Sequence, residues 1–142
     1  MEFIKKLVVI FCVLSAVGCA NGLNKVQERE YSVFEIEGAL VEEKNPSTGA
    51  VLGLLPGGGS FYAREPGFGV VNLLLWPLSI LWDPISGYDG AKAINYDLTK
   101  YQLKRKKKQE LAALSEKLEY GEIDSEGYTR EKWKIIHKYN YD

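Results

Sequence analysis

The amino-acid sequence predicts a mainly α fold, on three observations. In the last third of the chain, apolar residues recur at the spacing of one helix face, as at Leu111, Leu114 and Leu118. Residues that commonly cap helices, Asn45 and Asp124, stand just before segments with helical patterns. The composition, 46% apolar and 26% charged, is that of an ordinary folded protein, which excludes a collagen-like, a wholly disordered or a polytopic membrane chain.

Length and charge limit the organisation of the chain and its partners. The chain has 142 residues, which allows one domain or two small modules. Its 18 Lys and Arg residues nearly balance its 19 Asp and Glu residues, so the net charge is −1. Dedicated nucleic-acid binders are usually basic, and no nucleic-acid partner is therefore expected.

Residues 1–18 are predicted to be a lipoprotein signal peptide. Lys5 and Lys6 precede an uncharged, mostly apolar run that is too short for a membrane span of about 20 residues. The run ends at Gly18 and Cys19 and resembles the bacterial lipobox. That resemblance implies cleavage between Gly18 and Cys19 and attachment of diacylglycerol, with a further acyl chain such as palmitate, at Cys19. The alternative is an ordinary signal peptide that is cut elsewhere.

The same resemblance implies a location. Cys12 and Cys19 are the two cysteines, so the processed chain contains no disulfide. By resemblance to Gram-negative sorting signals, a residue other than Asp after the lipidated cysteine favours the outer membrane, and here that residue is Ala20. We expect a lipid-anchored protein of the bacterial cell envelope, at the outer membrane and facing the periplasm.

The next segments lead into an apolar region. Residues 19–30 are polar and predict a tether. Residues 31–43 are ambiguous between a helix and a strand, and we favour a short helix. Asn45 begins a turn that can cap a following helix. Residues 31–90 together are expected to form an apolar hairpin, which either associates with the membrane or forms the core of a small domain.

Residues 67–82 carry no charge. As one helix they span roughly 24 Å, short of a hydrocarbon core of ~30 Å, and Pro77 must kink or break that helix. Helical spacing places Asn72, Trp76, Ser79 and Asp83 on one side. Two interpretations stay open: a buried core helix, or a segment that lies in or dips into one leaflet. Length and proline disfavour a full transmembrane span.

The glycines Gly57, Gly58 and Gly59 also have two interpretations. Their backbone N–H groups can cradle an anion, or they can form a sharp turn that lets two apolar segments approach closely. No Gly-Lys-Ser/Thr follows them, so this is not a nucleotide-binding loop. We favour the sharp turn.

This region resembles the two-transmembrane-helix domain family, which has a Gly-rich turn containing Phe and Tyr and a second hydrophobic helix that ends near an Asp. The matching segments are residues 53–62, 66–69 and 73–76, followed by Asp83. Residues 76–84 also look like small bacterial envelope lipoproteins of unknown function. The second resemblance implies a membrane-associated fold and no chemistry.

Residues 91–109 predict a basic helix. Its densest run is Lys104, Arg105, Lys106, Lys107 and Lys108. Five consecutive helical residues point all round the helix, so they cannot all be buried. They either face solvent or contact anionic lipid headgroups, and Trp76 and Trp82 suit the same membrane surface.

Residues 110–142 resemble the SHOCT family, a short C-terminal helical hairpin. Gly121 is expected to end the first helix in the left-handed conformation, and Asp124 to cap the second. The resemblance implies oligomerisation or partner binding. The predicted interaction face is Leu111, Leu114, Leu118, Ile123 and Tyr128.

No set of residues predicts catalysis. His137 is the single histidine, and no His or Cys cluster has metal-ligand spacing, so we expect no catalytic residue, metal site or cofactor. The predicted function is a non-enzymatic bacterial envelope lipoprotein, anchored through Cys19, whose C-terminal module self-associates or binds a protein partner. The alternative is an envelope lipoprotein that binds a lipid or small ligand through residues 57–82.

Overall fold

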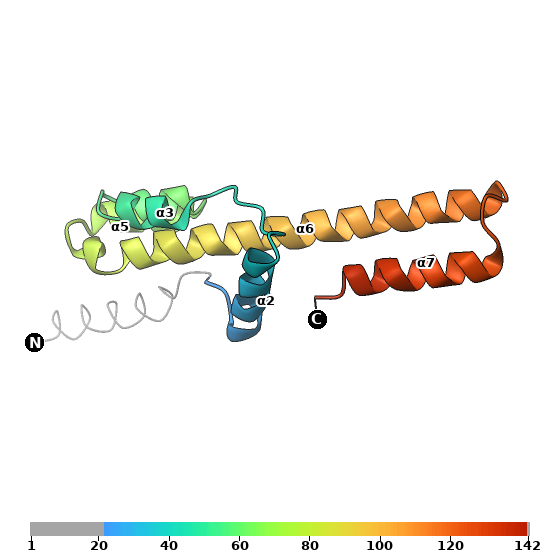
Figure 1. The fold of residues 1–142 in the computed structure, drawn as a ribbon. Coiled ribbons are helices and arrows are strands. Elements are labelled where there is room, and N and C mark those ends of the chain that lie inside the picture. Colours follow the sequence, from blue (N-terminus) through green and yellow to red (C-terminus); the bar gives the residue numbers. More distant parts are fainter. Residues whose placement is uncertain (1–21, 142) are drawn as a thin grey trace, which may run out of the picture. The chain divides into compact units, whose positions relative to one another are not determined.

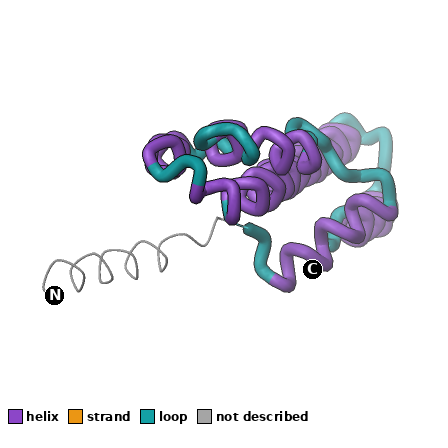
Figure 2. Tube along the Cα trace, turned by 90° about the vertical axis from the view of Figure 1, so that its left-hand side faces the viewer, coloured by secondary structure: helices purple, strands orange, loops and turns teal. Residues whose placement is uncertain are grey.

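The computed structural model describes residues 22–141, and this part of the chain is mainly helical and contains no strand (Figure 1, Figure 2). The predicted fold class is confirmed. The elements are α2 (Lys25–Ile36), α3 (Pro46–Leu52), α4 (Gly58–Tyr62), α5 (Pro66–Leu74), the 3₁₀ helix η1 (Leu78–Leu81), α6 (Asp83–Glu119) and α7 (Ser125–Lys138). The predicted signal peptide and the lipidation site at Cys19 lie outside the described residues.

The chain divides into two compact units. Unit 1 contains residues 22–25 and Glu42–Asn95, and unit 2 contains Val26–Val41 and residues 96–141. Helix α6 begins in unit 1 and continues into unit 2. One helix therefore covers the end of the predicted apolar region, the predicted basic helix 91–109 and the first helix of the predicted C-terminal hairpin. The change in composition near residue 91 marks a change in surface chemistry and not a helix end.

The helix ends follow the capping residues closely. Gly38 and Gly121 have positive φ angles of 65° and 71°, and each ends the preceding helix with the paired backbone hydrogen bonds of a left-handed cap. Asn45 Oδ1 accepts from the Thr48 N–H at 3.0 Å and caps α3. Asp124 Oδ1 accepts from the Gly127 N–H at 2.7 Å and caps α7. The predicted caps at Asn45, Gly121 and Asp124 are confirmed.

The predicted tether over residues 19–30 is wrong for its last part, because α2 begins at Lys25. The segment 31–43 continues this helix as far as Ile36, so its helical interpretation is confirmed up to that residue. Tyr31 and Phe34 are buried, and their packing stabilises a helix whose first turns are polar.

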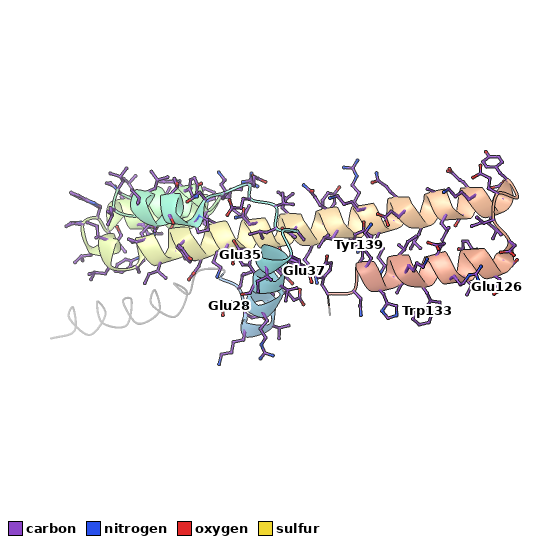
Figure 3. All side chains as sticks on the ribbon, viewed as in Figure 1. Glu28, Glu35, Glu37, Glu126, Trp133 and Tyr139 are labelled. Atoms are coloured by element: carbon purple, nitrogen blue, oxygen red, sulfur yellow. The ribbon has the colours of Figure 1, made fainter. Side chains whose placement is uncertain are left out.

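Unit 2 packs around Phe34 of α2. The Phe34 ring lies 6.0 Å from the Tyr96 ring of α6 and 5.0 Å from the Tyr141 ring near the C-terminus, measured between centroids. Helices α6 and α7 run side by side in this unit (Figure 1, Figure 3), and Glu110 of α6 accepts hydrogen bonds from Lys138 and Tyr139. The other buried residues of this unit, among those described, are Tyr31, Tyr96, Leu114 and the polar Thr99.

Glu30 of α2 makes unit 2 sensitive to acid. Its Oε2 accepts from Lys100 Nζ at 2.8 Å and from the Tyr96 hydroxyl at 2.6 Å. These two hydrogen bonds lower the pKa of Glu30 below 4.5, with that from Lys100 the larger cause. Because the pKa is lower in the folded than in the unfolded chain, the stabilisation is complete above pH 4.5 and is lost as the pH falls through the lowered value.

Glu30→Gln is therefore expected to reduce the stability of unit 2 at neutral pH by about 1 kcal/mol, and by less in acid, where the native side chain is already protonated. Amide hydrogen exchange in α2 at several pH values measures this difference. Glu28→Gln is the matched control, because Glu28 is exposed on the same helix (Figure 3). Equal losses for both variants, or a loss at Glu30 that does not change with pH, would contradict the expectation.

Candidate functional site

A buried carboxylate lies at the centre of unit 1. Asp83 is the first residue of α6, and its side chain is fully buried. Its Oδ2 accepts from the Gly59 N–H at 3.0 Å. Its Oδ1 accepts from the Ser60 N–H at 3.0 Å, from the Ser60 hydroxyl at 2.6 Å and from Asn72 Nδ2 at 2.7 Å. Four donors from α4 and α5 thus converge on one side chain of α6.

The network continues to an indole. Trp82 Nε1 donates to Asn72 Oδ1 at 2.9 Å, and Asn72 Nδ2 also reaches Ser60 Oγ at 2.9 Å. Ser79 is fully buried as well, but its hydroxyl has no hydrogen-bond partner among the described residues. The carboxylate, the amide and the indole therefore satisfy one another within the unit.

Both interpretations of the glycine turn describe part of what it does. Gly57 is the residue directly before α4 and has a positive φ of 69°, so the chain turns sharply here, which agrees with the favoured interpretation. The N–H groups of Gly59 and Ser60 also cradle an anionic group, and that group is the protein's own Asp83. The cradle is filled from within the chain.

Residues 67–82 do not form one continuous helix, and the predicted break at Pro77 is confirmed. Helix α5 ends at Leu74, a turn carries Pro77, and η1 follows. Proline lacks the N–H that a continuing helix needs, which explains the break. Asn72, Ser79 and Asp83 are buried, but Trp76 is exposed, and Trp82 supplies the indole of the network.

The interior of unit 1 is built from small and polar residues. Gly49 and Gly87 meet so closely that a Cβ on either one would lie 2.3 Å from the carbonyl oxygen of the other. Gly53 approaches Pro84 in the same way, and Gly90 approaches Ala63. The buried residues are Gly49, Gly53, Gly57, Gly59, Ser60, Ala63, Gly69, Asn72, Ser79, Asp83, Gly87, Gly90, Ala91 and Asn95. No large apolar side chain is among the buried residues of the described part of unit 1.

The large apolar side chains of unit 1 lie on its surface instead. Leu74 is 77% exposed and Leu81 is 76% exposed. The exposed set is Val51, Leu54, Leu55, Phe61, Val70, Val71, Leu73, Leu74, Leu75, Trp76, Leu78, Leu81, Ile85 and Tyr88. Soluble monomers rarely expose so much apolar side chain in one small unit, and a large exposed apolar surface marks an interaction or membrane site. Unit 1 thus has its polar groups inside and its apolar groups outside.

The two ends of unit 1 differ in chemistry. At one end, Gly53 lies beside Pro84, and Asn72 binds Asp83, so the turns after α3 and α5 meet the start of α6. We call this end the tip. Its exposed apolar residues are Leu54, Leu55, Leu74, Leu75, Trp76, Leu78 and Leu81.

The opposite end of unit 1 is charged. Arg64 pairs with Glu43, and Lys44 Nζ lies 4.5 Å from the centre of the Tyr62 ring. Asn95 of α6 ties this end together, since its Oδ1 accepts from the Glu43 and Lys44 N–H groups at 2.9 Å each. We call this end the charged end.

Comparison of the chain with models of protein families, with curated proteins and with solved structures found no match. The resemblances to the two-transmembrane-helix domain family and to the SHOCT family therefore stay predictions.

The predicted membrane-contact residues fall in different places. Trp76 is exposed at the tip, whereas Trp82 is half-buried and its indole belongs to the Asp83 network. The basic run lies on the part of α6 that belongs to unit 2, where Lys107 is half-exposed and the others, Lys104, Arg105, Lys106 and Lys108, are exposed. No helix among residues 22–141 is long and apolar enough to cross a membrane.

The predicted interaction face packs largely within unit 2. Leu114 is buried, and Leu111, Leu118, Ile123 and Tyr128 are half-buried. From the upstream helix α2, Phe34 contacts Tyr141, which follows α7. Trp133 of α7 remains exposed, points away from α6 (Figure 3) and stacks on His137 at 5.1 Å between ring centroids. Within the described residues there is no group of three or more His, Cys, Asp or Glu side chains that could hold a metal ion.

Sequence reasoning missed the central role of Asp83. A signal was present, since this acid directly follows a long uncharged run and two tryptophans. An acid in such surroundings needs internal hydrogen-bond donors, and the nearby Gly-rich turn and Asn72 offered them.

Proposed function

We propose that this chain is a non-enzymatic bacterial envelope lipoprotein that is attached to the membrane in two ways, through acyl chains on Cys19 and through the apolar surface of unit 1. The observation that carries the proposal is the inverted polarity of unit 1, with Asp83 and Asn72 inside and leucines such as Leu74 and Leu81 outside. In water this arrangement loses the benefit of apolar burial. Among acyl chains it is favourable, because the leucines contact lipid and the side chains of Asp83, Asn72 and Trp82 hydrogen-bond to one another or to α4.

The way the helices of unit 1 pack supports the same proposal. Lipid is as apolar as leucine, so helices in membranes gain little from burying leucines and associate through small residues that allow close approach. The contacts of Gly49 with Gly87, and of Gly53 with Pro84, are of this kind. The polar network around Asp83 adds interhelical hydrogen bonds.

Unit 2 is proposed to carry the protein-facing role. It is rich in charged residues, and in contrast to unit 1 it buries large apolar side chains: Tyr31, Phe34, Tyr96 and Leu114. The exposed pair of Trp133 and His137 is the candidate contact for a partner or for a second copy. Aromatic residues are enriched at such contacts.

One experiment with two arms tests the proposal. In cells, Cys19→Ala is expected to abolish labelling by radioactive palmitate and to leave an unprocessed precursor. In vitro, a chain that begins at Asn21 and lacks the lipid is expected to bind phospholipid vesicles through unit 1. Leu81→Asp is then expected to weaken vesicle binding at least about tenfold, because an acid among acyl chains is costly.

The matched control for the second arm is Ile36→Asp. Ile36 is 85% exposed on α2 and belongs to unit 2, so it tests the same substitution at an exposed apolar residue that is not part of unit 1. Its vesicle binding is expected to equal that of the parent. Acylation of the Cys19→Ala protein, or a folded Asn21 chain that stays in solution with vesicles present, would refute the corresponding attachment.

A further inference from the structure

We infer that unit 1 enters a single leaflet of the bilayer tip first, with its charged end at the level of the lipid headgroups. The inference rests on the proposed function and adds the direction and the depth of insertion. The apolar surface of unit 1 is then covered by the acyl chains of one leaflet.

Charge in unit 1 is separated along the direction from the tip to the charged end. Residues 45–63 and 66–82 contain no charged residue. Arg64 and Glu65 interrupt these runs at the charged end, where the chain turns from α4 into α5. On α6, the next charged residues after the buried Asp83 are Asp89 and Lys92. A bilayer imposes the same separation, because charges stay at headgroup level.

The length of the uncharged surface fits one leaflet. Helix α5 has nine residues, all uncharged, and is about 14 Å long. The stretch of α6 from Asp83 to Lys92 has about the same length at 1.5 Å per residue. Half of a hydrocarbon core of ~30 Å is about 15 Å. Unit 1 therefore reaches from the headgroups towards the midplane and no further.

The polar network lies where such an insertion needs it. Asp83 and Asn72 are close to the tip, and at that depth water cannot supply a missing hydrogen bond. Both oxygens of the carboxylate are occupied by donors of unit 1. The Asn72 amide also accepts from Trp82.

The charged end has the residues of a headgroup region. Arg64 adopts a φ of 64°, a conformation that glycine takes more readily, yet it places an exposed guanidinium beside Glu43. Tyr62 and Tyr88 lie against the ammonium groups of Lys44 and Lys92. Tyrosine and basic side chains together mark the membrane–water interface.

Lipid explains the distribution of exposed apolar residues better than a second copy of the chain. The exposed residues come from every helical element of unit 1, for example Val51 of α3, Phe61 of α4, Val70 of α5 and Ile85 of α6. A two-fold contact covers one patch on each copy. Acyl chains surround all sides at once.

Depth-dependent quenching tests the inference. Leu78→Cys at the tip, Val70→Cys in α5 and Ser47→Cys at the start of α3 are each introduced into the full chain, which is purified from membranes and labelled with an environment-sensitive fluorophore. The parent chain gives the background labelling. Vesicles of phosphatidylcholine and phosphatidylglycerol carry a nitroxide either near the headgroup or near the acyl-chain terminus.

The expected result is a gradient. The ratio of deep to shallow quenching is highest for the Leu78 label, intermediate for Val70 and lowest for Ser47. Equal, shallow quenching of all three labels means that unit 1 lies flat, which overturns the inference but leaves the proposed function standing. If the fluorophore at Leu78→Cys is shielded from water in the absence of lipid, and copies of the chain crosslink to one another, the inference is overturned in favour of self-association. No quenching by lipid at any position overturns the inference and the membrane role of unit 1 together.

Discussion

Asp83→Ala is expected to destabilise unit 1 by about 4 kcal/mol. The substitution removes the acceptor of the Gly59 and Ser60 N–H groups, and both donors stay buried. A buried donor without a partner costs about 1–3 kcal/mol. The cavity left by the carboxylate and the loss of an acid at the start of α6 add to this cost. Asp83→Asn keeps the shape and one acceptor oxygen, so its effect is expected to be smaller.

Amide hydrogen exchange at Gly59 and Ser60 measures the effect directly, because these N–H groups lose their acceptor. Exchange is expected to accelerate at both positions in the Asp83→Ala protein, together with a lower midpoint of thermal unfolding. Asp97→Ala is the matched control, since Asp97 is exposed on the same helix. Unchanged protection of the Gly59 and Ser60 amides from exchange in the folded variant would show that Asp83 does not hold α4 in place.

Local features of the fold were predictable, and the reason is that each depends on a few neighbouring residues. The helix caps at Asn45 and Asp124 need contacts that span three residues. The left-handed cap at Gly121 needs one glycine in the right place. The basic run around Lys106 is exposed because five successive helical side chains cannot be buried together.

Long-range features were not predictable from periodicity. The bond between Gly59 and Asp83 joins residues 24 apart, across the turns that follow α4 and α5. Helical spacing predicted that Trp76 lies on the same side as Asn72. Because the helix breaks before Pro77, it is Trp82 whose indole hydrogen-bonds to Asn72. An argument from helical spacing assumes one continuous helix, so its prediction fails where the chain breaks or turns back within the segment considered.

The start of α2 was missed for a related reason. Residues 25–30 are polar and look like a linker. They are helical because Glu30 binds Lys100 and Tyr96, and because Phe34 packs on Tyr96. These partners lie between 62 and 70 residues away in the sequence, so no local pattern reveals them.

Gly87→Ala is expected to destabilise unit 1 by about 3 kcal/mol, although alanine is the better helix former. An added Cβ would lie 2.3 Å from the Gly49 carbonyl oxygen of α3 and 2.8 Å from the Gly59 Cα of α4. Both contacts are with backbone, which cannot rotate away as a side chain can. The three helices must separate, and the hydrogen bonds from Gly59 and Ser60 to Asp83 are then strained.

Gly67→Ala is the matched control, because the same substitution in α5 meets nothing within 4 Å. With no clash, alanine gains helix propensity and loses less conformational entropy on folding, so the stability of unit 1 is expected to stay equal or to rise by up to about 1 kcal/mol. Thermal unfolding of both variants in the same lipid measures the difference. If Gly87→Ala proved as stable as Gly67→Ala, α6 would not pack against α3 and α4 through backbone contact. A loss at Gly87 alone, with faster exchange at Gly59, would tie the close packing of the glycines to the hydrogen bonds of Asp83.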